Sequence, residues 1–312
     1  MTSSTPRGES ALVTGGAGFI GSHLADALAE DNEVTVLDDL STGDPENVPA
    51  SATLVEGDIR DRTVLREAVD GVDVVFHEAA VVSVERSVEE PVESHRTNVD
   101  ATLHLLELAR EFDFRVVLAS SCAIYGQPET VPIPETATPD PTSPYGLEKL
   151  TLDHYARLYH DLYGVETVAL RYFNVYGPRQ AAGDYSGVIS IFLDRALDDE
   201  PLTIHGDGSQ TRDFVHVSDI VRANLLAATT DHVGEAFNVG TGDRTTILEL
   251  AETIRDVADS SSEIVHTDPR PGDIQRSCAD VSKGRKALGY DADLSLEEGL
   301  ADLVAERTGD AQ

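Results

Sequence analysis

Thr14-Gly15-Gly16-Ala17-Gly18-Phe19-Ile20-Gly21 is the stretch of this chain that decides its fold. It follows an apolar run at 11–13 and precedes an apolar spacing typical of a helix, so we expect a strand-to-helix turn. Gly15, Gly18 and Gly21 have the spacing that a dinucleotide requires: a tight turn, close approach of backbone to a pyrophosphate, and close helix packing. Phe19 and Ile20 open the helix, whose first N–H groups would face the phosphates.

Asp38 supports the nucleotide interpretation of this turn over a purely structural one. It ends the second predicted strand, 34–37, near the offset of about 20 residues at which an acid binds the adenosine ribose. A carboxylate there would repel a ribose phosphate, and the next basic residue after it is Arg60. The sequence therefore favours NAD over NADP as the cofactor.

Strands and helices alternate over the first 170 residues. The further strands that we expect lie at 53–56, 72–76, 115–119 and 167–171, and the helices at 62–69, 91–112 and 143–163. This alternation predicts an α/β protein with a Rossmann-type doubly wound parallel sheet and right-handed crossovers. After Asn174 the elements become shorter, although 236–239 looks like a strand that returns to the sheet. We predict an NAD-binding domain at 1–173, with the returning strand near 236–240, and a smaller α+β substrate domain at 174–312.

The net charge of the chain is unusual. The 57 acidic and 23 basic residues give a formal net charge of -34, and lysine occurs three times, as Lys149, Lys283 and Lys286. Such a surface repels itself at low salt, whereas near 1 M salt the screening length falls to roughly 3 Å. We therefore hypothesise a halophilic protein, with an ordinary acidic enzyme as the alternative. The same charge makes nucleic acid and anionic membranes poor partners.

The remaining composition indicates a cytoplasmic, soluble protein. The first ten residues are polar, and no apolar run approaches 18 residues. Cys122 and Cys278 make no disulfide framework, and we interpret both as small buried fillers, with a reactive thiol as the alternative for Cys122. We predict no metal site.

Tyr145 and Lys149 are four residues apart and therefore share one face of a predicted helix. An ammonium beside a phenol favours the phenolate, and an oxidised nicotinamide would add a second positive charge. To act as a base at neutral pH, the tyrosine would need its pKa to fall by roughly 3 units from about 10. For an isolated pair of this spacing, a surface contact is the alternative interpretation.

The pair is not isolated. With the glycine turn and Ser121 it resembles the extended short-chain dehydrogenase/reductase superfamily, and within it the NAD-dependent nucleotide-sugar epimerase/dehydratase family. The resemblance covers nearly the whole chain. It extends to the motifs at 77–80 (HEAA), 120–126 (SSCAIYG), 171–179 (RYFNVYGPR), 210–219 (QTRDFVHVSD) and 270–273 (RPGD).

This resemblance implies the role of each site residue. Tyr145 would be the catalytic base, Lys149 would bind the nicotinamide ribose and tune Tyr145, and Ser121 would hydrogen-bond the reacting sugar hydroxyl. The implied cofactor contacts beyond the glycine turn and Asp38 are Asp58, Ile59, Ala79, Ala80, Asn98 and Tyr172. The implied substrate contacts beyond Ser121 are Asn174, Val188, His205, Arg212, Arg270 and Asp273, with Asn174 and the arginines at the diphosphate and Asp273 at the uridine ribose.

Cys122 and Ala123 narrow the expected reaction. Dehydratases and decarboxylases of the resembled family carry acidic residues after the serine, and neither of these side chains can do that acid-base work. The expected reaction is 4-epimerisation of a UDP-sugar, glucose or galactose or their N-acetylated equivalents, through a transient 4-keto sugar. A small Ser277 in the sugar pocket would leave room for an N-acetyl group.

Other functions and the oligomeric state stay open at this point. A uronate epimerase, a keto-sugar reductase or an epimerase of another nucleotide is the second interpretation, and an NAD-binding regulatory module without catalysis is a remote third. Related enzymes commonly dimerise through the long helices that correspond to 91–112 and 143–163, so we predict a homodimer. Leu105, Leu108, Leu152 and Leu158 are candidates for its seam, although a face buried within the chain would look the same.

Overall fold

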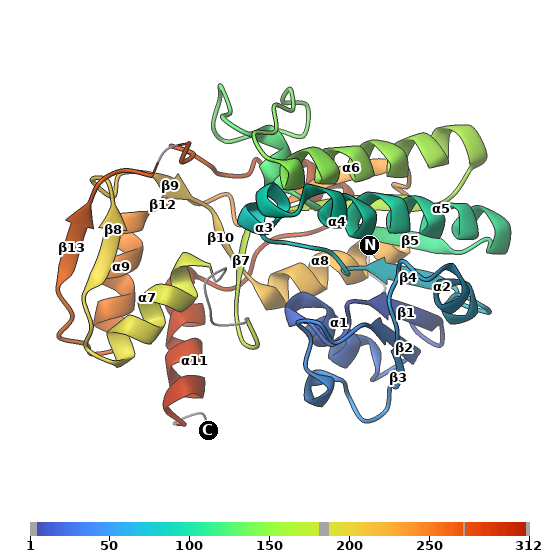
Figure 1. The fold of residues 1–312 in the computed structure, drawn as a ribbon, viewed down its shortest axis with the longest axis horizontal. Coiled ribbons are helices and arrows are strands. Elements are labelled where there is room, and N and C mark those ends of the chain that lie inside the picture. The colour runs from blue at the N-terminus through green and yellow to red at the C-terminus, as the bar shows by residue number, and fades with distance from the viewer. Residues whose placement is uncertain (1–4, 181–186, 271, 310–312) are drawn as a thin grey trace.

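A parallel sheet of seven strands runs through the larger part of the molecule. The computed structural model describes residues 5–180, 187–270 and 272–309. The strand order is β3-β2-β1-β4-β5-β6-β11, and each neighbouring pair is parallel, which confirms the predicted doubly wound α/β sheet (Figure 1). The bounds are β1 Ser10–Thr14, β2 Glu33–Asp38, β3 Thr53–Glu56, β4 Val74–His77, β5 Arg115–Ser121, β6 Thr167–Tyr172 and β11 Glu235–Val239.

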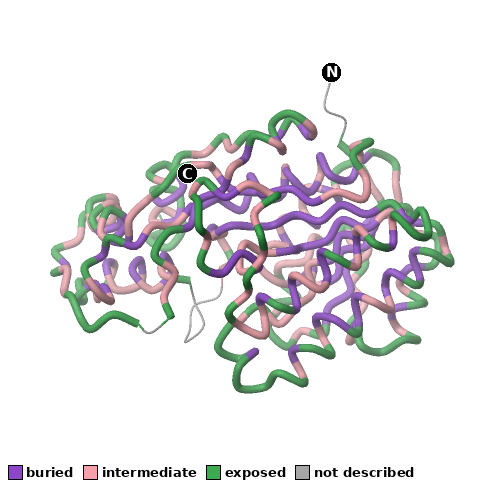
Figure 2. Tube along the Cα trace, turned by 90° about the horizontal axis from the view of Figure 1, so that it is seen from above, coloured by how far each residue is buried: buried purple, intermediate pink, exposed green. Residues whose placement is uncertain are grey.

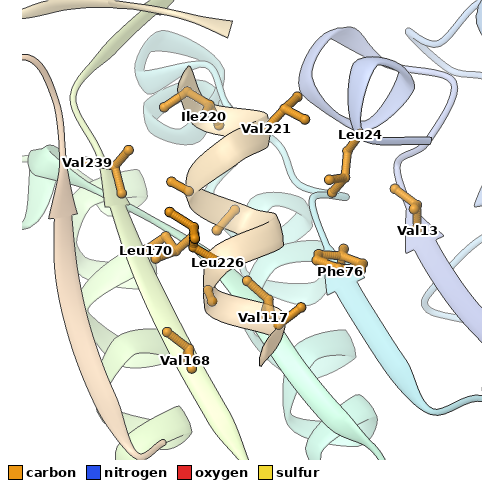
Figure 3. Close-up of a cluster of buried hydrophobic side chains, with 14 of the residues drawn as sticks. Val13, Leu24, Phe76, Val117, Val168, Leu170, Ile220, Val221, Leu226 and Val239 are labelled. Atoms are coloured by element: carbon orange, nitrogen blue, oxygen red, sulfur yellow. The ribbon is translucent and has the colours of Figure 1, made fainter. Parts of the chain in front are cut away.

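Helices cover both faces of this sheet. They are α1 Phe19–Leu28, α2 Arg62–Ala68, α3 Val84–Glu89, α4 Pro91–His95, α5 Ala101–Phe112, α6 Pro144–Tyr163 and α8 Val217–Thr229. Successive strand residues point to opposite faces, so Val74 and Phe76 pack with α1 and α8, whereas Val75 packs with α5 and α6. Figure 2 shows the buried strands between the two helical layers, and Figure 3 shows α8 lying on the apolar face of the sheet.

The chain returns to the sheet after leaving it. β11 pairs with β6 in the register Phe237 to Leu170, and α8 packs on the same layer as α1. The returning strand predicted near 236–240 is therefore present. Because α8 and β11 come from beyond residue 173, the division of the chain at 173 and 174 stays a prediction.

A smaller group of elements surrounds a separate apolar cluster. It contains a parallel pair, β8 and β13, packed with α7, α9 and α11 (Figure 1). Two further pairs, β7 with β10 and β9 with β12, join this part to the edge of the main sheet. The bounds are β7 Asn174–Tyr176, α7 Val188–Leu197, β8 Leu202–His205, β9 Thr211–Arg212, β10 Phe214–His216, β12 Thr245–Thr246, α9 Ile247–Val257, β13 Ile264–Thr267 and α11 Leu296–Thr308. Another helix, α10 Ser282–Ala287, packs beside β11 of the main sheet.

The helix expected at 91–112 is interrupted. Between α4 and α5 the backbone follows a π-helical turn over Arg96–Asp100. The turn carries Asn98 inward, where its side chain bonds the backbone of Val81 and the carboxylate of Glu148. Apolar spacing is the same on both sides of such a turn, so the sequence pattern does not reveal it.

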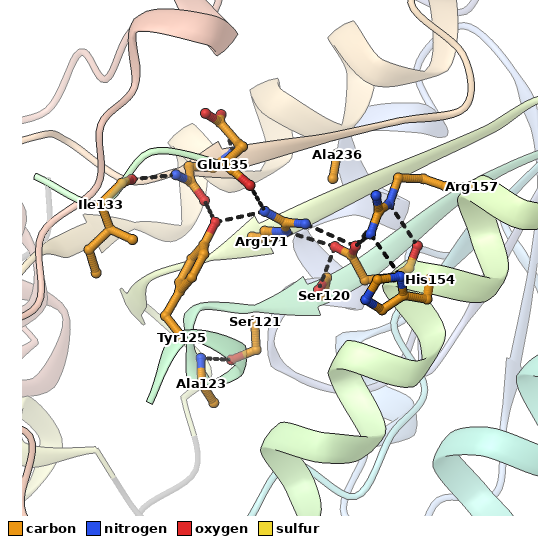
Figure 4. Close-up of polar contacts among 12 residues, drawn as sticks. Ser120, Ser121, Ala123, Tyr125, Ile133, Glu135, His154, Arg157, Arg171 and Ala236 are labelled. Atoms are coloured by element: carbon orange, nitrogen blue, oxygen red, sulfur yellow. Dashed lines mark hydrogen bonds and ion pairs between the residues drawn. The ribbon is translucent and has the colours of Figure 1, made fainter. Parts of the chain in front are cut away.

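A buried network ties α6 to β6 (Figure 4). The Arg171 guanidinium contacts both carboxylate oxygens of Asp153, at 2.7 and 2.9 Å, and Arg157 adds a third contact at 2.8 Å. Arg171 also donates to the Tyr125 hydroxyl at 2.8 Å and to the Glu135 backbone oxygen at 2.9 Å. The Asp153 carboxylate and the Arg171 guanidinium therefore both have several hydrogen-bond partners. We call Asp153, Arg157 and Arg171 the Asp153 cluster.

Three of the four leucines proposed for a dimer seam are core residues instead. Leu105, Leu108 and Leu152 are at most 2% exposed and pack between the sheet and its helices, whereas Leu158 is 46% exposed. In the part of the chain that the structure describes, no helix combines the length and the apolar character that crossing a bilayer requires.

Candidate active site

The glycine turn at the end of β1 is shaped by contacts that exclude side chains. Gly15 has φ +69°, and a Cβ on it would lie 2.7 Å from the backbone nitrogen of Ala79. A Cβ on Gly21 would lie 2.2 Å from the Gly15 oxygen, so only glycine lets α1 pack this close to the turn. Gly18 caps α1 without a side-chain hydrogen bond, which leaves the helix N-terminus able to bind an anion.

Asp38 lies at the end of the neighbouring strand with a fixed carboxylate. It is 7% exposed, and its two oxygens accept hydrogen bonds from the Ala17 nitrogen at 3.0 Å and the Leu40 nitrogen at 2.9 Å. The carboxylate thus lies beside the glycine turn, as a ribose-binding acid would. Together with the uncapped helix, this cradle fits the phosphates and ribose of a dinucleotide.

Tyr145 and Ser121 meet where α6 begins beside the end of β5. The Ser143 hydroxyl caps α6, and the Tyr145 nitrogen donates to Ser87 at 3.1 Å, which fixes the first turn. The Ser121 hydroxyl accepts a hydrogen bond from the Ala123 nitrogen at 3.1 Å, and it also acts on the nearby Tyr145 phenol, whose pKa it lowers. The predicted base and the predicted sugar-binding hydroxyl are therefore neighbours.

Burial sets the proton affinity of Tyr145 in the protein alone. It raises the pKa of the phenol to about 12, and the Ser121 hydrogen bond opposes this shift. The direction is opposite to the one expected from Lys149, because burial is the largest cause of the shift and the charges of Glu78 and Glu148 act in the same direction as burial. Lys149 Nζ lies 5.9 Å from the centre of the Tyr145 ring and donates to the Ala119 backbone oxygen at 2.7 Å. The phenolate therefore needs a further positive charge.

Two carboxylates flank the buried Lys149 ammonium. Burial lowers the pKa of Lys149, and the charges of Glu78 and Glu148 raise it. Glu148 is held by Ser94 and Asn98, each at 2.7 Å, on the far side of α6 from solvent. We call Lys149, Glu78 and Glu148 the Lys149 cluster.

Glu78 and Tyr172 connect the ends of β4 and β6. The Tyr172 hydroxyl donates to Glu78 Oε1 at 2.7 Å and accepts from Asn224 Nδ2 of α8 at 2.7 Å. Burial raises the pKa of Glu78 and raises the pKa of Tyr172 well above its usual range. Tyr172, which we expected to line the cofactor, is thus the middle member of a buried hydrogen-bond chain.

The substrate-side residues gather at the end of β9 and β10. Arg212 forms an ion pair with Asp273 at 2.6 Å, so the residues predicted for the diphosphate and the ribose are in contact. Asn174 Nδ2 donates to the Asp213 backbone oxygen at 3.0 Å, which brings it next to Arg212. Under them the buried Asp213 carboxylate accepts bonds from Thr241, Gly242 and Ala279 and fixes this corner.

The other predicted contacts lie farther along the same edge. Val188 is the first residue of α7, His205 ends β8, and Arg270 is exposed on the loop after β13. Pro271 of the 270–273 motif lies outside the described residues. On the cofactor side, Ala79 and Ala80 follow β4, Ile59 is buried, and Asp58 forms an ion pair with Arg60 at 2.6 Å.

Cys122 has the properties of an inert thiol. Cys122 is half-buried rather than fully buried as expected, but the burial of its thiol raises its pKa to about 12, and the charge of Asp213 acts in the same direction. Cys278 is buried, and burial raises its pKa to about 12 as well. These shifts favour the filler interpretation of both cysteines over a reactive one.

Sequence reasoning assigned no role to several residues that build the site. Glu78 follows β4, Glu148 lies on α6 and Asn224 lies on α8, and Glu78 and Asn224 both bond the Tyr172 hydroxyl only in the folded chain. Glu78 carried one signal: an acid directly after an apolar strand, at the sheet edge where ligands bind.

Comparisons with known proteins agree with this geometry. The NAD dependent epimerase/dehydratase family matches residues 11–240. The UDP-glucose 4-epimerase of Mycolicibacterium smegmatis is 38% identical over 302 residues, which are 94% of this chain and 96% of the relative. The solved UDP-N-acetylglucosamine 4-epimerase of Methanobrevibacter ruminantium M1, in complex with UDP-N-acetylmuramic acid, has a TM-score of 0.94 at 38% identity and covers 98% of this chain and 100% of that one. The UDP-glucose 4-epimerase of Thermotoga maritima, with UDP-glucose, has a TM-score of 0.93 at 40% identity and covers 96% of this chain and 99% of that one.

Proposed function

This chain belongs to the NAD dependent epimerase/dehydratase family, and we propose on the geometry of its site that it interconverts the 4-epimers of a UDP-sugar. The observation that carries the proposal is that the Tyr145 phenol and the Ser121 hydroxyl lie close enough to interact, with Cys122 and Ala123 following the serine. This arrangement can move a proton at a sugar hydroxyl but supplies no carboxyl after Ser121 for eliminating water or carbon dioxide.

Tyr145, Ser121 and Lys149 would divide the proton chemistry among them. The Tyr145 phenolate takes the proton of the sugar 4-hydroxyl and later returns it, and Ser121 holds that hydroxyl in line. Lys149, anchored on the Ala119 oxygen, supplies a fixed positive charge beside both groups. When bound, NAD would accept the hydride from C4 and give it back to the other face of the 4-keto sugar, with no net redox change.

The described residues can hold this cofactor. Gly15, Gly18 and the start of α1 would take the pyrophosphate, and Asp38 the adenosine ribose. Arg212 and Arg270 would take the substrate diphosphate, for which a guanidinium is well suited because it can donate two parallel hydrogen bonds. These contacts are part of the proposal.

The test is conversion without added cofactor. Purified protein in molar salt is incubated separately with UDP-glucose, UDP-N-acetylglucosamine and UDP-glucuronate, and the sugars are followed by NMR. We expect a 4-epimer of at least one of the first two, because a reaction without net redox change can use NAD that stays bound. The Y145F variant is the control. Conversion of none, or conversion of UDP-glucuronate alone, would contradict the proposal.

Ser277 makes the N-acetylated sugar a candidate substrate. It is 5% exposed and lies against Cys122 beside Ser121, so two small side chains occupy this wall of the site. Replacing Ser277 with Tyr would fill the space that an N-acetyl group needs. We expect S277Y to lose UDP-N-acetylglucosamine turnover while keeping UDP-glucose turnover; equal loss of both would contradict this part of the proposal.

We also propose that the protein is a homodimer through α3, α4 and α6. These helices pack side by side and carry apolar residues that are about half exposed or more: Val84, Val88, Val92, Leu147, Leu158 and Leu162. In a chain of net charge -34, such a stripe is best covered by a second copy of itself. Light scattering in molar salt should give a dimer for the wild type and a monomer for V88E/L162E; a monomeric wild type would overturn this.

The net charge of -34 also supports the proposal that the protein works in a salt-rich cytoplasm. Most of the 57 acidic side chains would repel one another in dilute buffer, and molar salt screens this repulsion. We expect the unfolding temperature to fall on dialysis from molar to low salt. An unchanged unfolding temperature would remove the halophilic part of the proposal.

A further inference from the structure

Glu78 is a half-buried acid of the site that the proposed reaction does not use. It directly follows β4, and its Oε1 accepts from the Tyr172 hydroxyl at 2.7 Å. That hydroxyl in turn accepts from Asn224 Nδ2 at 2.7 Å, and Tyr172 and Asn224 are 6% and 0% exposed. The two hydrogen bonds that run from Asn224 on α8 through Tyr172 on β6 fix the orientation of the Glu78 carboxyl group. A side chain held so firmly at the ligand-binding edge of the sheet calls for a function.

The register of the sheet brings Glu78 next to the Lys149 ammonium. His77 is paired with Leu118 across β4 and β5, so the following residues, Glu78 and Ala119, are neighbours at the strand ends. Lys149 Nζ donates to the Ala119 oxygen at 2.7 Å. The positive charge of Lys149 is therefore held at the level of Glu78, and the two groups interact electrostatically.

We propose that Glu78 is a positioning residue for the reaction: it holds the Lys149 ammonium against the Ala119 oxygen and thereby sets the pH range in which Tyr145 works. The inference rests on the proposed function, because it takes Tyr145 as the base. It assigns Glu78 no contact with the substrate.

The sign of the effect follows from the charges around Glu78. The titratable groups that face it or its partners are Lys149, Tyr145 and Glu148 from α6, Tyr172 from β6 and His77 from β4. The Glu78 carboxylate raises the pKa of Lys149 and the pKa of Tyr145, because a negative charge favours an ammonium and disfavours a phenolate. Neutralising it moves both titrations toward lower pH.

The experiment compares pH profiles of E78Q and the wild-type holoenzyme. Glutamine keeps an oxygen that can accept from Tyr172 but removes the charge. With UDP-glucose and UDP-N-acetylglucosamine as probes, we expect both limbs of the kcat/KM profile to move to lower pH by about one unit. E89Q, which removes an equal charge from an exposed position on α3, is the matched control and should keep the wild-type profile.

Two further measurements separate electrostatics from packing. E78D keeps the charge on a shorter side chain, so its kcat should fall while both limbs stay at their wild-type positions. The ultraviolet absorbance of the Tyr145 phenolate, taken as the difference between each protein and its Y145F counterpart, should appear at lower pH in E78Q than in the wild type.

The outcomes distinguish this inference from the proposed function. A wild type that converts UDP-sugar, together with an E78Q profile and phenolate titration unchanged from wild type, would overturn the role of Glu78. Limbs of E78D that move as far as those of E78Q would overturn it too, because the charge would then not be the cause. A wild type that converts none of the UDP-sugars would overturn the proposed function instead.

Discussion

Helix α6 carries two buried ionic clusters one turn apart, and they differ in how completely their charges are paired. In the Asp153 cluster, Arg171 and Arg157 surround one carboxylate with hydrogen bonds. The pKa of Asp153 is lowered and that of Arg171 is raised, since each partner's charge and hydrogen bonds outweigh burial. Both shifts favour the charged forms.

The Lys149 cluster shows the opposite directions. Burial lowers the pKa of Lys149 and raises that of Glu78, so both groups are displaced toward their neutral forms. The ammonium bonds a backbone oxygen rather than a carboxylate. Residues on and around the same helix are thus held in their charged forms where pairing is complete and are displaced toward their neutral forms where it is not, beside the base of the proposed reaction.

The largest effect on activity is expected beside the Lys149 cluster, when Tyr145, one turn before Lys149 on α6, is replaced with Phe. Loss of the phenolic base should lower kcat by about 10³-fold or more, because general base catalysis contributes about 10² to 10⁴. The free energy of unfolding should change by no more than about 1 kcal/mol. Epimerisation followed by NMR and denaturant unfolding measure the two effects. Y163F, on an exposed ring at the end of α6, is the control and should keep full activity.

The converse effect should follow from replacing Arg171 with Met. Asp153 would keep a buried charge without its main partner, which costs about 3 to 5 kcal/mol of unfolding free energy. R86M breaks an exposed pair, Arg86 with Glu90 at 3.2 Å, and should cost less than about 1 kcal/mol. Equal costs for the two variants, measured by denaturant unfolding in molar salt, would remove the distinction between buried and exposed pairing.

The next largest expected effect is on the pH dependence of stability, which should have opposite signs for Asp153 and Glu78. Asp153 has a lowered pKa, so its contribution is present above about pH 4 and is lost as the pH falls through the folded-state pKa. Glu78 has its pKa raised to about 7, so between about pH 4.5 and 7 the folded state binds more protons than the unfolded state. Raising the pH through this window should lower the stability of wild type relative to E78Q, by at most roughly 1.4 kcal/mol per unit. A relative stability that rises with pH there would have the wrong sign.

The smallest expected effect is that of salt concentration on the ion pair between Asp153 and Arg171. Asp153 and Arg171 have side chains 0% and 4% exposed, so bulk ions screen their attraction little. Raising salt from low to molar concentration should change the stability of the whole protein, yet change the difference between wild type and R171M by less than about 0.5 kcal/mol. Parallel unfolding curves at several salt concentrations test this. If the stability difference between wild type and R171M changed with salt as much as the stability of the wild type does, the pair would not be shielded from bulk ions.

Sequence alone predicted the sheet, the glycine turn and the placement of Tyr145 and Lys149 on one helix, because each depends on local spacing. It missed the π-helical turn at Arg96–Asp100, since the apolar residues on either side keep a helical spacing. It placed Leu105 and Leu152 at a possible seam because burial by the chain's own sheet and burial by a partner require the same residues.

The pKa shifts of the candidate site residues were harder to predict than the identities of those residues. Tyr145 and Lys149 were found from a spacing of four, but the direction of the pKa shift of Tyr145 depends on burial and on where the ammonium points. Glu78 meets Tyr172 and Asn224 only through strand order and helix packing, separated by 94 and 146 positions in sequence. Such contacts have no local pattern.

The late return of β11 has a consequence for how the chain is made. β6 ends at Tyr172, and the strand that covers its outer edge is Glu235–Val239, more than sixty residues farther on. During synthesis, β6 therefore leaves the ribosome with one row of backbone donors and acceptors uncovered, at an edge where another nascent chain can pair. Closure of this edge must wait for translation of residue 239 and its passage through the exit tunnel, so the edge stays open to other chains for that whole interval.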